Sequence, residues 1–575
     1  MTEFSGRVDQ VREICRRLAP ILGDKAGEIF RAYLAEDKTG KEQIQTYLEA
    51  LAAESLGEGI EPSTDILVPP KASEAAGAYP LGSVIYAGRD MHPYGVRENE
   101  WIQHVGIFGR TGAGKTNLGY LILEQLQKHK KPFLVFDWKR TYRDLTALPG
   151  FQDICVFTPG RETAPLTFNP LIPPAGTPAK TWLKKIIEVI AHAYMLGNGV
   201  LYLLQESVDA VYERFGLYSG RIERYPTIRD VLDEAKRRDA KGREAGWLAS
   251  TLRALASMCF GDMDRVVNAG LNQHLADLLE KPVILELDAL TQSDKVFFIQ
   301  AVLLWIHHYR MTDGQRETFK HAILVEEAHH VLSGERRSLV GGQSVMEITF
   351  REIREFGESI IILDQHPSQV SVPALGNTYT TFCLNLKHSK DVSAMGQCML
   401  MKGEEKDILG SLEVGQAVVK LQGRAPKPFL IKIPPFPIPK GVVSDAEIAE
   451  KMASFVGIRP ENRASVVFFR ENRPVARTAV PMTFPPARPT NHDLLFLQDV
   501  FSHPESGIAG RYKRLGISVR QGQKLKVRLV EEGFILETLE TTRTGSIRVI
   551  RLTEKGEGRV QEANDLDDEE LQEEG

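Results

Sequence analysis

The stretch of sequence that decides the fold is Gly109-Arg110-Thr111-Gly112-Ala113-Gly114-Lys115-Thr116. It follows the apolar run 105–108, which is typical of a buried strand, and it precedes a helical pattern that extends to about residue 128. A glycine-rich turn between a strand and a helix brings main-chain N–H groups and a helix N-terminus to one point, where a phosphate group binds well. The spacing of the glycines, the lysine and the threonine is that of a P-loop, so the stretch predicts a nucleotide site.

Two side chains of the P-loop carry specific chemistry. Lys115 neutralises the β- and γ-phosphates, and the hydroxyl group of Thr116 ligates Mg²⁺. We therefore expect ATP and Mg²⁺ as cofactors. The predicted nucleotide-contacting residues are Gly109, Arg110, Thr111, Gly112, Ala113, Gly114, Lys115, Thr116 and Asn117.

A second predicted strand, at residues 322–325, leads into the acidic pair Glu326 and Glu327. Ligands of open α/β sheets bind at the carboxyl ends of the strands, so these two carboxylates are expected near the P-loop. Glu326 would support the metal ion and Glu327 would polarise the attacking water. The alternative is a solvated acidic strand end, which the complete P-loop makes less favourable.

Strands and helices alternate over residues 100–440, which predicts an α/β fold with a mainly parallel sheet. Residues 178–280 are mostly helical and are expected to form an insertion between strands. The other predicted segments are a helical N-terminal region (1–57), a connecting segment with a small β element (58–99), a linker (441–489), a small domain (490–562) and an acidic tail (563–575).

The composition limits the possible partners and location. The 575 residues carry a formal net charge of −5, so any contact with DNA must come from local basic patches. The 5 cysteines include no CxxC pair, which is typical of a reducing compartment without a zinc site. No run of about 20 apolar residues is present, so we expect a cytoplasmic protein without a membrane span.

Three further motifs accompany the P-loop. They are Val325-Glu326-Glu327-Ala328-His329, Leu363-Asp364-Gln365-His366-Pro367-Ser368 and Glu352-Ile353-Arg354-Glu355-Phe356-Gly357. Asp137 and the segment Phe168-Asn169-Pro170-Leu171 also fit the same pattern. With these motifs, residues 102–435 resemble the HerA/FtsK group of P-loop ATPases, and the HerA-like branch most closely.

The resemblance implies a RecA-like P-loop NTPase core in a hexameric ring that translocates or unwinds DNA. It implies that Gln365 senses the γ-phosphate and that Arg354 acts in the catalytic site of a neighbouring subunit. It also implies a partner enzyme such as a nuclease. The chain departs from the family pattern at Asp364, where threonine is usual, at Glu326, where aspartate is usual, and in its helical N-terminus, where relatives often have a β-barrel.

The small domain at 490–562 resembles a winged helix, with three helices followed by two short strands. Its third helix carries Arg520, Lys524 and Arg528 at spacings of four residues, so the three share one face. This face predicts either contact with DNA or a docking surface for a protein, and the near balance of acids and bases leaves both open.

The sequence therefore favours a hexameric, ATP-hydrolysing DNA translocase that works with a partner enzyme in DNA processing or defence against foreign DNA. One alternative is a winged-helix DNA-binding regulator that is switched by ATP. Another is the coupling ATPase of a DNA-transfer system, which the missing membrane span makes less favourable.

Overall fold

The structure is a computed structural model, and it describes residues 2–56, 67–270, 275–312, 314–333, 345–455, 491–504, 506–542 and 545–561. The chain divides into two compact units, at residues 1–467 and 468–575. Most of the predicted linker and the whole predicted acidic tail lie outside the described residues.

One large sheet forms the centre of the first unit, and within the described residues it has eleven strands. The strands from β9 to β5 are parallel, and those from β2 to β10 form an antiparallel flank. This confirms the predicted α/β fold with a mainly parallel sheet. In order across the sheet, the strands are β2 (Arg89–Val96), β1 (Tyr79–Tyr86), β11 (Phe429–Lys432), β10 (Gln416–Leu421), β9 (Thr380–Cys383), β3 (Val105–Phe108), β8 (Glu358–Asp364), β7 (His321–Glu326), β4 (Phe133–Asp137), β6 (Pro282–Glu286) and β5 (Cys155–Phe157).

The central strands β3, β4, β7 and β8 are buried at every residue, which explains their continuous apolar sequences. The helix α6 (Lys115–Lys128) follows β3, and α13 (Gln292–Met311) is buried along most of its length. The shorter helical elements of this unit are α4 (Ala72–Ala75), α5 (Glu98–Trp101), η1 (Arg143–Ala147), η2 (Ala328–His330), α14 (Val345–Glu352), η3 (Ile353–Phe356), η4 (Pro367–Gln369), α15 (Val372–Gly376), α16 (Ser389–Cys398), η5 (Gly403–Asp407) and α17 (Ile408–Ser411).

The hairpin of β1 and β2 is a part of the central sheet, whereas the sequence had placed it in a connecting segment. β1 pairs with β11 through Ser83 and Val84. A Cβ atom at Gly82 would overlap the carbonyl oxygen of Lys432, so this close approach of two strands requires glycine. Because β11 lies more than 300 residues away in the sequence, the local pattern of the hairpin could not indicate this pairing.

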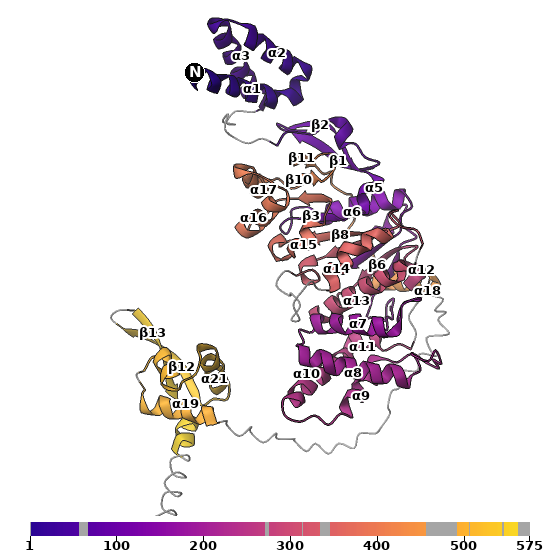
Figure 1. Cartoon of the computed structure of the whole chain (residues 1–575), viewed down its shortest axis with the longest axis vertical. Coiled ribbons are helices and arrows are strands. Elements are labelled where there is room, and N and C mark those ends of the chain that lie inside the picture. Colours follow the sequence, from indigo (N-terminus) through magenta and orange to yellow (C-terminus); the bar gives the residue numbers. More distant parts are fainter. Residues whose placement is uncertain are drawn as a thin grey trace, which may run out of the picture. The chain divides into compact units, whose positions relative to one another are not determined.

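Most of the helices between β5 and β6 form a group below the sheet in Figure 1. Trp182 of α7 is buried, and its indole N–H donates to the carbonyl oxygen of Pro170 at 2.8 Å. No helix among the described residues is both long enough and apolar enough to cross a membrane. The helices of this group are α7 (Ala179–Ala193), α8 (Asn198–Arg214), α9 (Ile228–Lys236), α10 (Arg243–Met258) and α11 (Gly261–Val267), and the short helix α12 (Leu275–Leu278) follows them in the sequence.

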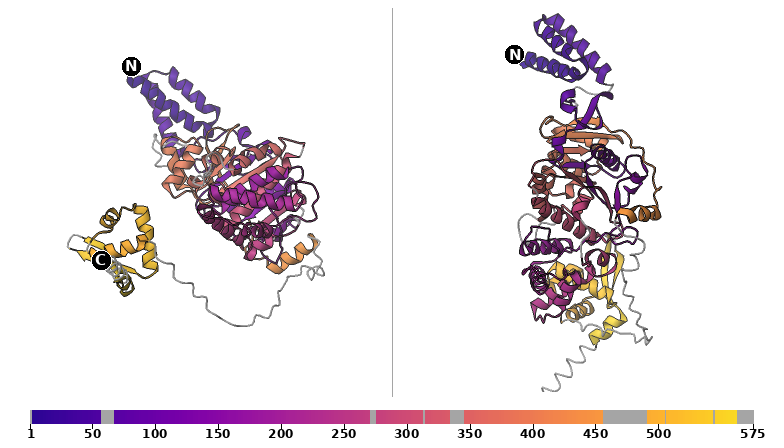
Figure 2. Two further views of the ribbon diagram at one scale, coloured as in Figure 1. Left: turned by 60° about the horizontal axis from the view of Figure 1, so that its bottom comes forward. Right: turned by 90° about the vertical axis from the view of Figure 1, so that its right-hand side faces the viewer.

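Three N-terminal helices lie side by side in all views (Figure 2). They are α1 (Thr2–Leu22), α2 (Asp24–Ala35) and α3 (Lys38–Leu56). Val11, Leu18 and Leu48 are fully buried among them. The hydroxyl group of Tyr86 on β1 donates to the carbonyl oxygen of Arg17 at 2.7 Å, so α1 is fixed to the hairpin.

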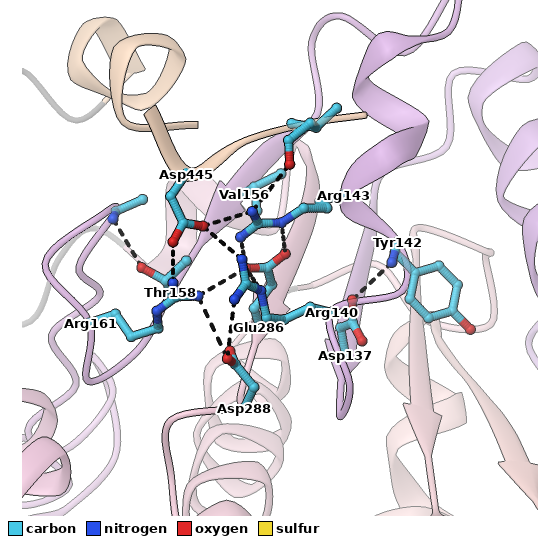
Figure 3. A network of polar contacts seen from close by, with 12 residues as sticks. Asp137, Arg140, Tyr142, Arg143, Val156, Thr158, Arg161, Glu286, Asp288 and Asp445 are labelled. Carbon is cyan, nitrogen blue, oxygen red and sulfur yellow. Dashed lines mark hydrogen bonds and ion pairs between the residues drawn. The ribbon is translucent and has the colours of Figure 1, made fainter. Parts of the chain in front are cut away.

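The last described helix of the first unit, α18 (Asp445–Phe455), begins in a network of arginines (Figure 3). Asp445 pairs with Arg140 at 2.8 Å and with Arg143 at 2.7 Å, and it also pairs with Arg161. Arg143 is buried, and its Nε atom donates to Glu286 at the end of β6 at 2.6 Å. These ion pairs fix the start of α18 near the carboxyl ends of β4, β5 and β6.

The second unit contains α19 (Asn491–Ser502), α20 (Ile508–Arg514), α21 (Val519–Glu531) and a two-stranded antiparallel sheet of β12 (Ile535–Thr542) and β13 (Gly545–Leu552). Phe496, Leu529 and Ile535 are among the residues of its small core. Arg511 is fully buried, and it donates to the carboxylate of Asp499 at 3.0 Å. The unit therefore has a core and a buried ion pair of its own.

A buried ionic group at the start of β8 gives a test of the core. Glu358 accepts hydrogen bonds from Arg310 and His321, each at 2.6 Å, and all three side chains are buried. Burial alone would raise the pKa of Glu358, but His321 and Arg310 hold this pKa below its ordinary value. The carboxylate is therefore charged and compensated, and it connects α13, β7 and β8.

We predict that Glu358→Gln lowers the free energy of unfolding of the first unit by about 3–5 kcal/mol, because Arg310 would keep a buried charge without its carboxylate. The control is Glu355→Gln, three residues earlier, where the side chain is exposed. Denaturant unfolding followed by circular dichroism measures both variants. Equal midpoints for the two variants would contradict a stabilising role of this ion pair.

Candidate functional site

The P-loop connects β3 to α6, and its backbone explains its glycines. Gly112 and Gly114 have φ angles of 79° and 108°, in the left-handed region that favours glycine. A Cβ atom at Gly109 would lie 2.9 Å from Cβ of Leu384, so the loop lies against the end of β9. The loop therefore combines two left-handed turns with one close approach, and larger residues would disturb both.

Lys115 lies at the first position of α6 and points back over the loop. Its Nζ atom donates to the carbonyl oxygens of Gly109 at 2.7 Å and Arg110 at 3.1 Å. Burial lowers the pKa of Lys115, and the nearby carboxylates of Glu327 and Asp364 oppose this effect. The lysine is thus held by neutral acceptors that phosphate oxygens can replace, with a gain in charge compensation.

The strand register brings the carboxyl ends of β3, β7 and β8 to one edge of the sheet. Phe108 of β3 is paired with Asp364 of β8, and Leu363 of β8 is paired with Glu326 of β7. Each of these three strands ends at this edge, and the chain leaves the sheet at the next residue. The P-loop and the residues that follow β7 and β8 therefore start from neighbouring points at the carboxyl edge, where ligands of such sheets bind.

A chain of hydrogen bonds links the P-loop to Glu327. The Thr111 hydroxyl donates to Oε1 of Gln365 at 2.5 Å, and Nε2 of Gln365 donates to Oε1 of Glu327 at 2.6 Å. The same carboxylate oxygen accepts from Lys139 at 2.9 Å. The structure thus places Thr111, Gln365 and Glu327 together. Lys139 is a further residue of this cluster, and its place two residues after Asp137 is the only signal in the sequence.

Glu327 has an unusual backbone. Its φ and ψ angles are 49° and 45°, in the left-handed region, which costs a non-glycine residue about 1–3 kcal/mol. The residue stands between β7 and η2, and its carboxylate meets Gln365 and Lys139 there. Such strain persists where the surrounding structure holds it, and it is concentrated at functional sites.

Glu326 and Asp137 form a buried acidic pair beside this cluster. The Tyr142 hydroxyl donates to Glu326 at 3.1 Å, and Asp137 accepts the main-chain N–H of Tyr142 at 2.9 Å. The pKa of Glu326 is raised to about 8, mainly by burial and to a smaller extent by the charge of Asp137. Within the described residues neither carboxylate has an ion pair. Carboxylate oxygens are the ligands that Mg²⁺ prefers, and Thr116, the second residue of α6, carries a hydroxyl group of the same ligand class.

Asp364, at the position where threonine is usual in the HerA/FtsK pattern, has a structural role. Its Oδ2 atom accepts from the main-chain N–H of His329 at 2.6 Å, and its Oδ1 atom accepts from that of His366 at 2.7 Å. The ring of His329 lies 2.9 Å from the same carboxylate. Asp364 is fully buried, so it needs these donors, and it holds together the two turns that carry Glu327 and Gln365.

Arg354 lies at the opposite edge of the sheet from its own P-loop. It is exposed in η3, just before β8 begins. The seven residues of β8 separate it from the carboxyl edge by about 20 Å. Within the part of the chain that the structure describes, Arg354 makes no ion pair. The structure therefore does not bring Arg354 to the phosphate site of the same chain.

Two other predicted nucleotide contacts have partners within the protein. Arg110 donates from its Nε atom to the side-chain oxygen of Asn385 at 2.8 Å, on the β9 side of the loop. Asn117 donates to the carbonyl oxygen of Pro434 at 2.9 Å and accepts from the N–H of Phe436 at 2.7 Å. The amide of Asn117 thus fixes the segment after β11 against α6.

The predicted basic face of α21 is only partly available. Lys524 is exposed. Arg528 pairs with the carboxylate of Asp493 on α19, so its charge is already compensated within the unit. The side chain of Arg520 lies outside the described residues. Asp493 lies 35 residues earlier in the sequence, which is why the helical spacing alone could not indicate this ion pair.

Part of the chain is similar to known proteins. Residues 79–181 match the family model described as "Helicase HerA, central domain". The probable helicase MJ1565 of Methanocaldococcus jannaschii is 21% identical over 328 residues, which are 55% of this chain and 60% of that protein. The chain thus covers less than two thirds of this relative. The resemblance to HerA-type P-loop ATPases is confirmed.

Solved structures also resemble the chain. VirB4 of Thermoanaerobacter pseudethanolicus is 15% identical with a TM-score of 0.49, over 63% of this chain and 98% of that protein. The plasmid coupling protein TrwB, in complex with a non-hydrolysable ATP analogue, is 10% identical with a TM-score of 0.48, over 67% of this chain and 98% of that chain.

We predict that Glu327→Gln retains ATP binding and loses hydrolysis by about 10²–10⁴-fold, because an amide cannot accept a proton from water as a carboxylate does. Lys115→Ala should lose both binding and hydrolysis, since it removes the charge at the phosphates. Equilibrium ATP binding and phosphate release are measured for each variant. The control is Glu317→Gln, which changes an exposed carboxylate. Near-normal turnover of Glu327→Gln would transfer its role to another acid, first Glu326.

Proposed function

We propose that this chain is an ATP-hydrolysing DNA translocase that assembles as a hexameric ring. The observation that carries the proposal is the hydrogen-bonded series from Thr111 through Gln365 to Glu327 beside the P-loop. It joins a phosphate-binding loop, a polar sensor and a carboxylate in one cluster. The match to the central domain of helicase HerA supports the same reading.

The chemistry of hydrolysis follows from the positions of these side chains. Lys115 would compensate the charge that develops on the phosphates, and Mg²⁺ held by Thr116 and Glu326 would supply further positive charge there. Glu327 would orient and deprotonate the attacking water. Gln365 donates to Glu327 and accepts from Thr111, so a change at the γ-phosphate can reach the end of β8 through one amide.

Ring assembly is supported by the location of Arg354. An exposed arginine at the amino edge cannot reach the phosphates of its own chain, but it can reach those of a neighbour that packs head to tail. Contacts of that kind close into rings when the rotation permits. The number six is proposed from the resemblance to HerA-type ATPases.

The second unit is proposed to be a winged helix, with α19 to α21 followed by β12 and β13 as the wing. Its exposed Lys524 supports contact with phosphates, and the pairing of Arg528 reduces the basic surface. We further propose a partner enzyme of the nuclease class, in DNA processing or defence against foreign DNA. The partner enzyme is proposed from the resemblance to HerA-type ATPases.

The main test measures ATP turnover against the length of added duplex DNA. A translocase should be stimulated more by long duplexes than by short ones at equal nucleotide concentration, because each binding event is followed by many steps. A regulator should instead show weak turnover and protection of one preferred sequence. The mass of the native complex with ATP and DNA then gives the number of subunits.

We predict that Arg354→Ala leaves ATP binding intact and lowers hydrolysis by about 10³–10⁵-fold, as for other arginines that act across an interface. Mixing it with Lys115→Ala should restore part of the activity, because a mixed interface can hold one intact lysine and one intact arginine. Phosphate release from mixed rings is the measurement, and Arg351→Ala is measured in parallel because Arg351 is the alternative arginine, one helical turn earlier. Mixed rings that stay inactive would count against action in trans.

We predict that replacing Arg520 and Lys524 with alanine lowers the slope of log affinity for DNA against log salt by about two units, if both contact phosphates. Arg528 is left unchanged because its ion pair with Asp493 stabilises the unit. The control is Lys513→Ala on α20, which is also exposed. A translocase should lose affinity for unrelated sequences equally, whereas an unchanged slope would indicate that α21 faces a protein.

A further inference from the structure

A cavity of about 530 Å³ lies beside the P-loop, on the side away from Glu327. It is formed by Arg110, by the segment that follows β9 and by the elements α16, η5 and α17. Because β3 is flanked by β8 on one side and β9 on the other, the P-loop separates this cavity from the catalytic cluster. The cavity thus borders the nucleotide site without containing any of the proposed catalytic residues.

The lining of the cavity is basic. Arg110, Lys387 and Lys406 contribute positive charges, and Asp407 contributes the single negative charge among its lining residues, which leaves a net charge of +2. Within the described residues, the side chains of Lys387 and Lys406 have no ion pair and no hydrogen bond. This local excess of positive charge contrasts with the formal net charge of −5 of the whole chain.

The positions of these cations are built into the fold. The stem of Lys406 lies on α16, since a Cβ atom at Gly396 would lie 2.7 Å from its Cδ atom. Asn385 orients Arg110, and its own amide donates to the carbonyl oxygens of Gly410 at 3.1 Å and Leu412 at 2.8 Å. The fold thus holds two of the three cations at the cavity in place.

The occupant that fits is a phosphodiester. The ten-residue helix α16 begins at Ser389 in the wall of the cavity, and its N-terminus adds a partial positive charge. Flexible lysines and an arginine are the side chains that usually contact a nucleic-acid backbone. A cavity of this size exceeds one phosphate group and has room for the adjoining sugar. Val392 supplies an apolar wall for that sugar.

We infer that this cavity, which we call the basic pocket, binds the phosphodiester backbone of the DNA strand. The inference rests on the proposed function and adds to it the place where the ATPase core itself contacts DNA. Arg110 belongs to the P-loop, and its main-chain N–H donates to the carbonyl oxygen of Asn385 at 2.7 Å. DNA in the basic pocket therefore acts on the P-loop through a single residue, which supplies a direct route for DNA-stimulated hydrolysis.

The test uses the full-length chain with Lys387→Gln and Lys406→Gln combined, because glutamine removes both charges and keeps most of each stem. The matched control combines Lys390→Gln and Lys402→Gln, two exposed lysines near the same elements that do not line the pocket. Duplex DNA affinity is measured by fluorescence anisotropy over a salt series. We expect the slope of log affinity against log salt to fall by about two units in the first variant only.

Three outcomes would each overturn the inference. If wild type and control bind DNA and the first variant keeps the same slope, the basic pocket is not a DNA site and the proposed function stands. If wild type shows no salt-dependent DNA binding, both the inference and the proposed function are overturned. If the first variant raises the KM for ATP and keeps the DNA slope, the pocket belongs to the nucleotide site and the inference is wrong.

Discussion

The parallel pairing of β3, β8 and β7 is the constraint on which the candidate site depends. Phe108, Asp364 and Glu326 come to one edge because hydrogen bonds fix how the three strands align. The chain turns away after each strand, and these turns carry the P-loop, Gln365 and Glu327. A shift of one residue in either pairing would send alternate side chains to the opposite face of the sheet and separate the cluster.

Burial then determines how the carboxylates at this edge behave. The carboxylate of Asp364 is compensated by main-chain N–H groups and by the ring of His329, so it holds together the turns that follow β7 and β8. Glu326 has one hydroxyl donor, one main-chain donor at Trp138 and a neighbouring acid, and burial raises its pKa to about 8. The two acids differ because their donors differ, and a divalent cation is the species that would stabilise the ionised form of Glu326.

The P-loop connects two sides of the sheet through adjacent residues. Thr111 bonds to Gln365 on the β8 side, and Arg110 bonds to Asn385 on the β9 side. A single peptide bond therefore joins the residue that contacts the catalytic cluster, Thr111, to the residue that lines the basic pocket, Arg110. The arginine network around Asp445 fixes another part of the same edge, near the carboxyl ends of β4, β5 and β6 (Figure 3).

The sequence by itself determined the features that local pattern encodes: the P-loop, the buried strands and the acids that end β7. Spacing of glycines and apolar runs reports backbone conformation and burial directly, so the α/β fold with a mainly parallel sheet followed from it. Only the tertiary structure decided the partners of these residues. The pairing of β1 with β11, the contact of Lys139 with Glu327 and the pairing of Arg528 with Asp493 each join distant parts of the chain. Such contacts depend on how strands and helices pack in space, and no local periodicity records that packing.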